Sequence, residues 1–140
     1  MNIAAIISRD LHKGSTQYRI AQYGDFLNQK GITVTYIRRD EVSGQMEVMR
    51  AADLVFNQKC LLNMRTSRQL LALSKPTLFD FDDAIYTRPG KSFSLFTQFK
   101  VKARFHLWLK HSDLITTPNE FLAGYARRQG AKVEVVPMAI

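Results

Sequence analysis

Residues 114–120 read LITTPNE, an apolar, β-branched run that passes directly into the start of a helix. Thr117 is the predicted N-cap, with Pro118 at the first helical position and a glutamate three residues after the cap. Gly130 predicts the end of that helix, and 133–136 is the next β-branched run. Strands that alternate with helices pack as a parallel sheet covered by helices. This unit therefore predicts an α/β fold.

The same alternation extends over the rest of the chain. The other predicted strands are Asn2–Ile7, Ile32–Ile37, Leu54–Phe56 and Thr77–Phe81. The other predicted helices are a segment from Ser15 to about Gly31 with Ser15 and Thr16 as caps, Glu41–Ala52 weakened by Gly44, Leu61–Leu73 and Phe93–Lys110. We expect one domain over residues 1–140, a Rossmann-like three-layer sandwich with a mostly parallel sheet of about six strands.

Composition and charge narrow the functional classes. Apolar residues make up 46% of the chain and charged residues 23%, which excludes a disordered chain. The net charge of +8 predicts an anionic partner, namely nucleic acid, an acidic membrane surface or a phosphorylated substrate, with an inert basic surface as the alternative. The single Cys60 forms no disulfide within the chain, and the apolar run 3–7 is too short for a signal peptide. These features predict a cytoplasmic protein.

The loop after the first strand, 9–16, is the first candidate site. In doubly wound sheets ligands bind at the carboxyl ends of strands, where a helix start offers free N–H groups to an anion. Gly14 permits a close approach of the backbone, and Arg19 adds a cation. The loop matches neither the P-loop nor the dinucleotide-binding glycine pattern, so a plain turn with solvated charges is the alternative.

The acidic stretch FDFDDA at 79–84 is the second candidate site. Its three carboxylates repel one another unless a cation or a proton lies among them. The string resembles the first motif of haloacid-dehalogenase-like phosphatases, in which Asp80 would be the nucleophile. However, Ala84 stands where those enzymes usually have Thr or Val, and only 57 residues follow Asp83. A phosphatase is therefore the less favoured interpretation.

The predicted helix Phe93–Lys110 has two apolar stripes on opposite sides, separated by basic residues. One stripe contains Phe96, Phe99, Ala103 and Leu107, and the other contains Val101, Phe105, Trp108 and Leu109. One stripe must cover the sheet. The second needs a partner, which would be a neighbouring helix, a second domain or a membrane interface, and packing within the domain is the expected outcome.

Four segments together resemble the amino-terminal half of GT-B glycosyltransferases of the group-1, or family-4, kind. They are KGSTQYRIAQY at 13–23, FDFDDAIY at 79–86, SDLITTPNEFL at 112–122 and VEVVP at 133–137. Their order and spacing cover nearly the whole chain. In that family the amino-terminal domain binds the acceptor, and a second Rossmann-like domain with paired glutamates binds the nucleotide sugar.

The resemblance implies a function for the chain. No counterpart of the glutamate motif is present, so the resemblance implies an acceptor-binding half whose donor-binding domain is absent and which is inactive alone. No metal or other cofactor is implied. The implied partners are a sugar or lipid-linked acceptor of polysaccharide or glycolipid synthesis, and a nucleotide sugar through the missing domain. A peripheral position on an anionic inner membrane face would suit the basic charge.

The resemblance also implies site residues. Gly14 and Ser15 would lie in the loop that faces the interdomain cleft, and Tyr18 and Arg19 would point toward the acceptor or the donor phosphate.

At the mouth of the fourth strand, Asp82 would be the catalytic proton acceptor and Asp83 would meet acceptor hydroxyls. Asp80 would be structural, holding the end of the strand.

A rival class is a stand-alone anion-binding or nucleic-acid-binding α/β module, although no nucleic acid is expected as a partner. The positions of the cations should discriminate the two classes. A continuous basic stripe with exposed aromatic residues favours nucleic acid, and a basic cleft at the strand ends favours the transferase.

Overall fold

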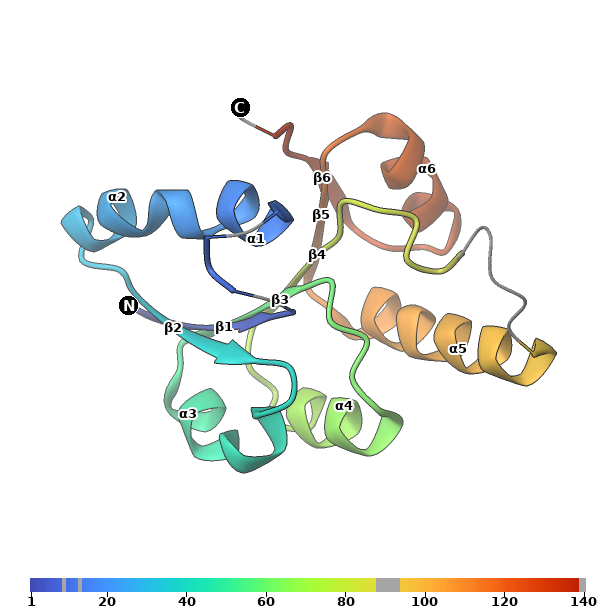
Figure 1. The fold of residues 1–140 in the computed structure, drawn as a ribbon, viewed down its shortest axis with the longest axis horizontal. Coiled ribbons are helices and arrows are strands. Elements are labelled where there is room, and N and C mark those ends of the chain that lie inside the picture. Colours follow the sequence, from blue (N-terminus) through green and yellow to red (C-terminus); the bar gives the residue numbers. More distant parts are fainter. Residues whose placement is uncertain (9, 13, 88–93, 139–140) are drawn as a thin grey trace.

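The computed structural model describes residues 1–8, 10–12, 14–87 and 94–138 (Figure 1). The strands are β1 (Asn2–Ile7), β2 (Thr33–Arg38), β3 (Leu54–Gln58), β4 (Thr77–Asp80), β5 (Leu114–Thr117) and β6 (Val133–Val135). The helices are α1 (Gly14–Arg19), α2 (Gly24–Gln29), α3 (Met46–Ala51), α4 (Met64–Leu71), α5 (Leu95–His111) and α6 (Glu120–Arg128). Two 3₁₀ turns, η1 (Ala21–Tyr23) and η2 (Val42–Gly44), precede α2 and α3.

The strands form one sheet in the order β2-β1-β3-β4-β5-β6, and every pair of neighbours is parallel. Helices α1 and α2 lie on one face of the sheet, and α3 to α6 lie on the other (Figure 1). The chain moves outward from β1 to β2 and then returns past β1 to β3. Because crossovers are right-handed, this reversal places the helices on opposite faces. The predicted six-stranded, Rossmann-like sandwich is confirmed.

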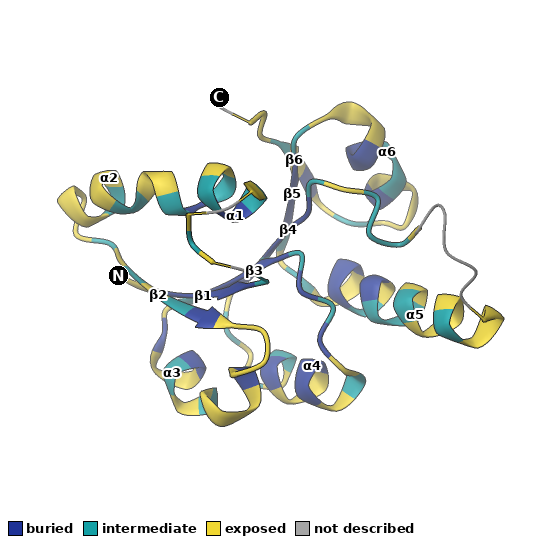
Figure 2. Cartoon of the chain, in the orientation of Figure 1, coloured by how far each residue is buried: buried dark blue, intermediate teal, exposed yellow. Residues whose placement is uncertain are grey.

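Each face of the sheet has its own apolar core, which accounts for the apolar runs in the strands. The larger core lies under α3 to α6 and is built around four aromatic side chains: Phe79, Phe81, Phe105 and Trp108. The smaller core lies under α1 and α2 and contains Ala5, Ile20 and Phe56. Figure 2 shows the buried strands between partly exposed helices.

Two predicted helix starts are wrong. The N-cap of α6 is Asn119, whose side chain accepts a hydrogen bond from the backbone N–H of Leu122 at 3.0 Å. Thr117 cannot cap the helix because its backbone belongs to β5, where its carbonyl accepts from the N–H of Val136. Helix α1 begins at Gly14, so the predicted caps Ser15 and Thr16 lie inside the helix.

Two predicted helices are interrupted. The helix after Ser15 breaks at Ile20, a buried residue with φ of −144°, and resumes as η1 and α2. The segment from Glu41 to Ala52 breaks at Gly44, which ends η2 before α3 begins. The low helix propensity of glycine accounts for the second interruption.

The two apolar stripes of helix α5 differ in burial. Phe105, Trp108 and Leu109 are buried in the larger core, whereas Phe96 and Phe99 are exposed. The expected packing of both stripes within the domain is therefore wrong for these two phenylalanines. The helix is capped by the side chain of Ser94, and the predicted start at Phe93 lies outside the described residues.

Across the parts of the chain that the structure describes, no helix combines the length and the hydropathy needed to cross a bilayer.

The buried Cys60 gives a first test of the fold. Burial raises the pKa of its thiol to about 12, so almost no reactive thiolate is present at neutral pH. We expect the native chain to react with a disulfide reagent at pH 8 far more slowly than the chain unfolded in guanidinium. Absorbance of the released thiolate measures both rates, and equal rates would contradict the burial.

Candidate functional site

The candidate site lies at the carboxyl ends of the strands, where the sheet order reverses between β1 and β3. Gln58, the last residue of β3, is fully buried and bridges this point. Its amide oxygen accepts from the Thr16 hydroxyl and its amide nitrogen donates to the Ser15 hydroxyl, each at 3.1 Å. Ligands of open α/β sheets bind at such a switch point. One side chain therefore fixes the loop after β1 against the end of β3.

Lys59 follows Gln58 in an unusual backbone conformation, with φ of +48°. Its N–H donates to the carbonyl of Asp80 at 2.7 Å, so this conformation is fixed by the end of β4. The Lys59 ammonium lies 2.9 Å from a carboxylate oxygen of Asp82 and 3.1 Å from one of Asp83. Strained residues of this kind occur where surrounding structure over-determines them, often at functional sites.

Asp80 and Arg19 form a buried ion pair, with side chains 1% and 4% exposed. The Arg19 Nε donates to both carboxylate oxygens at 3.1 Å, and an Nη atom donates to one of them as well. The Thr116 hydroxyl donates to the same carboxylate at 2.6 Å. The other Nη of Arg19 donates to the carbonyl of Val136, just after β6.

The surroundings set the charge states of this pair. Burial raises the pKa of Asp80, and this effect exceeds the opposing effects of Arg19 and Thr116. Burial by itself lowers the pKa of Arg19, but its hydrogen bond to Asp80 and the charge of Asp80 outweigh burial and raise it. Each of the two side chains thus stabilises the charged form of the other inside the protein.

A pocket of about 170 Å³ opens beside the ion pair. Its lining comes from α1, η1, three strands and the segment after β6: Tyr18, Arg19, Tyr23, Phe56, Leu78, Asp80, Thr116, Val136 and Pro137. Tyr18 and Tyr23 are 41% and 38% exposed. Two aromatic walls over a polar floor can hold a small, hydroxyl-bearing ring such as a sugar.

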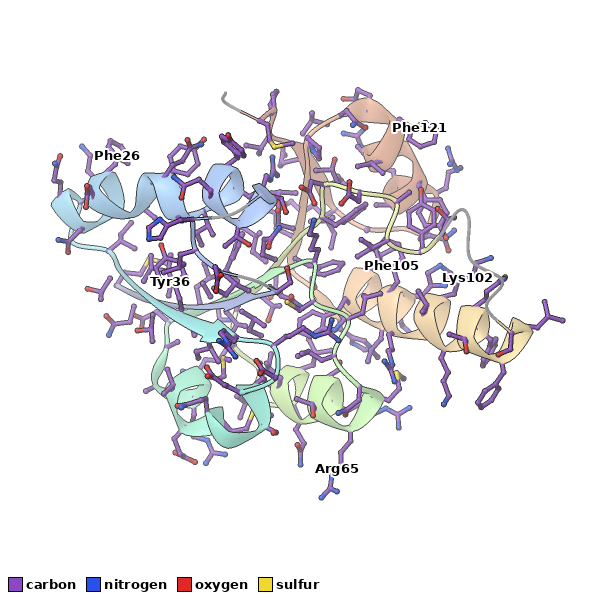
Figure 3. All side chains as sticks on the ribbon, in the orientation of Figure 1. Phe26, Tyr36, Arg65, Lys102, Phe105 and Phe121 are labelled. Carbon is purple, nitrogen blue, oxygen red and sulfur yellow. The ribbon has the colours of Figure 1, made fainter. Side chains whose placement is uncertain are left out.

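A second pocket, of about 530 Å³, lies at the carboxyl ends of β1 and β2. It is lined by Ile7, Asp10, Leu11, His12, Tyr36, Arg38 and Glu41. Arg38 pairs with Asp40 at 3.2 Å and approaches Glu41 at 3.9 Å, so its charge is already balanced. Figure 3 shows Tyr36 between β2 and α2.

The residues predicted from the loop and the first helix have different environments. Gly14 has φ of +55°, with open space beside its Cα, so a side chain there would be strained by the backbone alone. Ser15 is engaged by Gln58, Tyr18 lines the smaller pocket, and Arg19 is occupied by Asp80. Their substrate-binding roles stay predictions.

The two predicted acidic site residues share one counter-ion but differ in access. The side chain of Asp82 is 5% exposed and that of Asp83 is 69% exposed. Asp83 is therefore open to solvent, whereas Asp82 is buried against Lys59.

The phosphatase interpretation fails on Asp80. Its carboxylate is buried and already bound by Arg19 and Thr116, so it cannot attack a phosphate from solvent. No group of three potential ligands suited to a metal ion occurs among residues 1–8, 10–12, 14–87 and 94–138.

Three cations at the strand ends are matched by carboxylates and so add little net charge to that edge. Arg19, Arg38 and Lys59 all have acidic partners. Charge alone therefore does not favour the transferase over its rival.

Sequence reasoning missed three residues of the site: Gln58, Lys59 and Thr116. The first two come shortly after the predicted strand 54–56, separated from it by Asn57, and polar residues at a strand's carboxyl end are the signal that could have found them. Thr116 was assigned only to a strand.

The fold has counterparts among solved structures, although no protein-family model and no curated protein sequence matches the chain. HepE from Anabaena, in complex with UDP and glucose, matches 100% of this chain with a TM-score of 0.63 and 14% identity. HepE in complex with UDP-glucose matches with a TM-score of 0.60 and 14% identity. HepE is a GT-B glycosyltransferase.

The chain shares the fold of the part of HepE that it matches. The resemblance read from the sequence is confirmed at the level of the fold, which is all that 14% identity supports. The chain spans 45% of the length of HepE.

The Arg19–Asp80 pair predicts a large effect on stability. Arg19→Met or Asp80→Asn leaves one buried partner uncompensated and should lower the free energy of unfolding by about 3–5 kcal/mol. The double variant Arg19→Met/Asp80→Leu should recover most of that loss. Urea unfolding followed by circular dichroism measures all three.

The matched control is Arg38→Met, which breaks the exposed Arg38–Asp40 pair and should cost no more than about 1 kcal/mol. Equal, small losses at Arg19 and Arg38 would contradict the importance of the buried pair.

Proposed function

We propose that this chain is the amino-terminal, acceptor-binding half of a two-domain GT-B glycosyltransferase. The transfer would move a sugar from a nucleotide sugar to a polysaccharide or glycolipid precursor. The observation that carries the proposal is the match of the entire chain to 45% of HepE, a protein crystallised with UDP and UDP-glucose. A nucleotide-sugar site would then require a second domain.

Within this proposal the acceptor enters at the carboxyl edge of the sheet. The tyrosine-lined pocket beside Asp80 is of a size for a sugar ring, and the exposed Asp83 offers a carboxylate to its hydroxyl groups. Tyr18 lines this pocket from α1, whereas Gly14 and Ser15 stand at the start of the same helix, outside the pocket lining. Arg19 would act indirectly, by holding Asp80 in place beneath the pocket. It would contact the acceptor only if acceptor binding released it from Asp80.

Asp82 is the proposed proton acceptor of the transfer. The attacking hydroxyl must lose a proton, and a carboxylate within hydrogen-bond reach can take it. Lys59 neutralises Asp82 in the present arrangement and has Asp83 as a second partner within reach. Movement of Lys59 toward Asp83 would open Asp82 to the acceptor.

The proposed acceptor class also places the protein in the cytoplasm, peripheral on the inner face of the membrane. Lipid-linked precursors carry phosphate, and the net charge of +8 favours an anionic surface.

Nucleotide-sugar binding by the 140-residue chain tests whether the donor site belongs to a second domain. Because the proposed donor site belongs to a second domain, isothermal titration with common nucleotide sugars should show no binding tighter than millimolar. Micromolar affinity for any of them would overturn the assignment.

Asp82→Asn in the two-domain enzyme tests the chemistry. Loss of a proton acceptor should lower kcat by about 10²–10⁴ with little effect on unfolding, because asparagine keeps the size of the side chain. The control is Asp83→Asn, which has the same counter-ion but should mainly raise KM. A larger loss of kcat in Asp83→Asn would make Asp83 the proton acceptor and Asp82 the binding residue. Unchanged kinetics in both variants would contradict both roles.

A further inference from the structure

The positive charge of this protein is concentrated in one part of the sequence. Between Asp53 and Asp113 the chain has ten Lys and Arg but only three acidic residues, Asp80, Asp82 and Asp83. All three are engaged by Arg19 or Lys59 at the candidate site. Neither α4 nor α5 contains an acidic residue. The outer surface of these two helices is therefore basic without local compensation.

The same region carries three strongly exposed apolar side chains. Leu95, Phe96 and Phe99 are 85%, 66% and 71% exposed. They occupy the first turns of α5, which extend away from the sheet and its other helices (Figures 1 and 2). Lys100 lies over the ring of Phe96, 4.4 Å from its centroid, and Lys102 is exposed nearby. Apolar tips and cations thus share one helix end, called here the α5 tip (residues 95–102).

We propose that the α5 tip inserts into the headgroup boundary of an anionic membrane. Leu95, Phe96 and Phe99 would enter the boundary between headgroups and acyl chains, while Lys100 and Lys102 would remain at the lipid phosphates. Arg65 and Arg68, both exposed on α4, would add long-range attraction (Figure 3 shows Arg65 and Lys102).

Lipid fits this surface better than nucleic acid does. Bases stack on aromatic rings, so single-stranded nucleic acid would use Phe96 and Phe99 but would leave the aliphatic Leu95 in water. A bilayer boundary takes leucine and phenylalanine alike. The absence of acidic residues from α4 and α5 then removes repulsion along the whole approach to an anionic surface.

The position of the α5 tip connects it with the candidate site. Helix α5 follows β4 in a parallel sheet, so its first turns lie at the same edge as Asp82 and Asp83. Insertion of the tip would turn this edge toward the bilayer. This inference adds a membrane-binding surface to the proposed function. It rests on that function only for the identity of the acceptor as a lipid-linked precursor.

Vesicle co-sedimentation of the 140-residue chain tests the proposal without any sugar transfer. We expect binding to phosphatidylcholine vesicles that contain phosphatidylglycerol, weaker binding at high salt, and little binding to phosphatidylcholine alone. Phe96→Ser/Phe99→Ser should weaken binding by at least about tenfold. Lys100→Gln and Lys102→Gln should each weaken it by roughly fivefold.

The matched control is Phe26→Ser/Lys30→Gln on α2, on the opposite face of the sheet. Phe26 is 58% exposed and Lys30 lies over its ring at 5.6 Å, so the pair repeats the local chemistry of Phe96 and Lys100. This variant should bind vesicles like the unmodified chain. Equal losses in the α2 and α5 variants would overturn the proposal.

Depth of insertion gives a second readout. Trp108 is the only tryptophan of the chain and is fully buried. In a Phe99→Trp variant, brominated lipids should quench the added fluorescence, whereas Trp108 alone should be little affected. Three outcomes would overturn the proposal: no quenching with bound protein, binding to an oligonucleotide but not to anionic vesicles, or self-association that the Phe96→Ser/Phe99→Ser variant abolishes. If the two-domain enzyme transferred no sugar from a nucleotide sugar while vesicle binding was intact, that result would count against the proposed function alone.

Discussion

The buried contact between Arg19 and Asp80 joins parts of the chain that the sheet alone would leave independent. It connects the helix after β1 to the end of β4, and through Thr116 and the carbonyl of Val136 it reaches β5 and the exit of β6. A charge buried at this depth must keep its partner, because an unpaired one costs several kcal/mol. The four segments must therefore stay together, and they form the floor and rear wall of the smaller pocket.

The ion pair also changes how the net charge should be interpreted. A net charge of +8 suggests unpaired cations at a binding cleft, yet Arg19 and Lys59 at the strand ends are paired with carboxylates. Recognition at this edge can then depend on hydroxyl groups, aromatic walls and exchangeable ion pairs. The uncompensated charge lies on α4 and α5. Two surfaces of different chemistry thus meet at one edge of the sheet.

Local patterns were enough to predict the strands, because the central strands are apolar runs buried under helices and the edge strands are rich in β-branched residues. The predicted bounds of β1 agree with the structure, and the interruption at Gly44 follows from the low helix propensity of glycine. Thr117 was mistaken for a cap because strand pairing and capping compete for the same residue. Arg19 and Asp80 are 61 residues apart, and no local pattern indicates which cation such a carboxylate will meet.

Helix α5 shows the same limit for packing. Its sequence has two apolar stripes, and periodicity alone gives no reason to bury one rather than the other. Two aromatic side chains, one in β4 and one directly after it, determine which stripe is buried. The ring centroid of Phe79 lies 5.7 Å from that of Trp108, and the ring centroid of Phe81 lies 5.1 Å from that of Phe105. Once that stripe is buried, Phe96 and Phe99 on the other side must face outward. Their exposure is a consequence of the core. Because α5 is the helix that follows β4 in a parallel sheet, its first turns lie at the edge that holds Asp82.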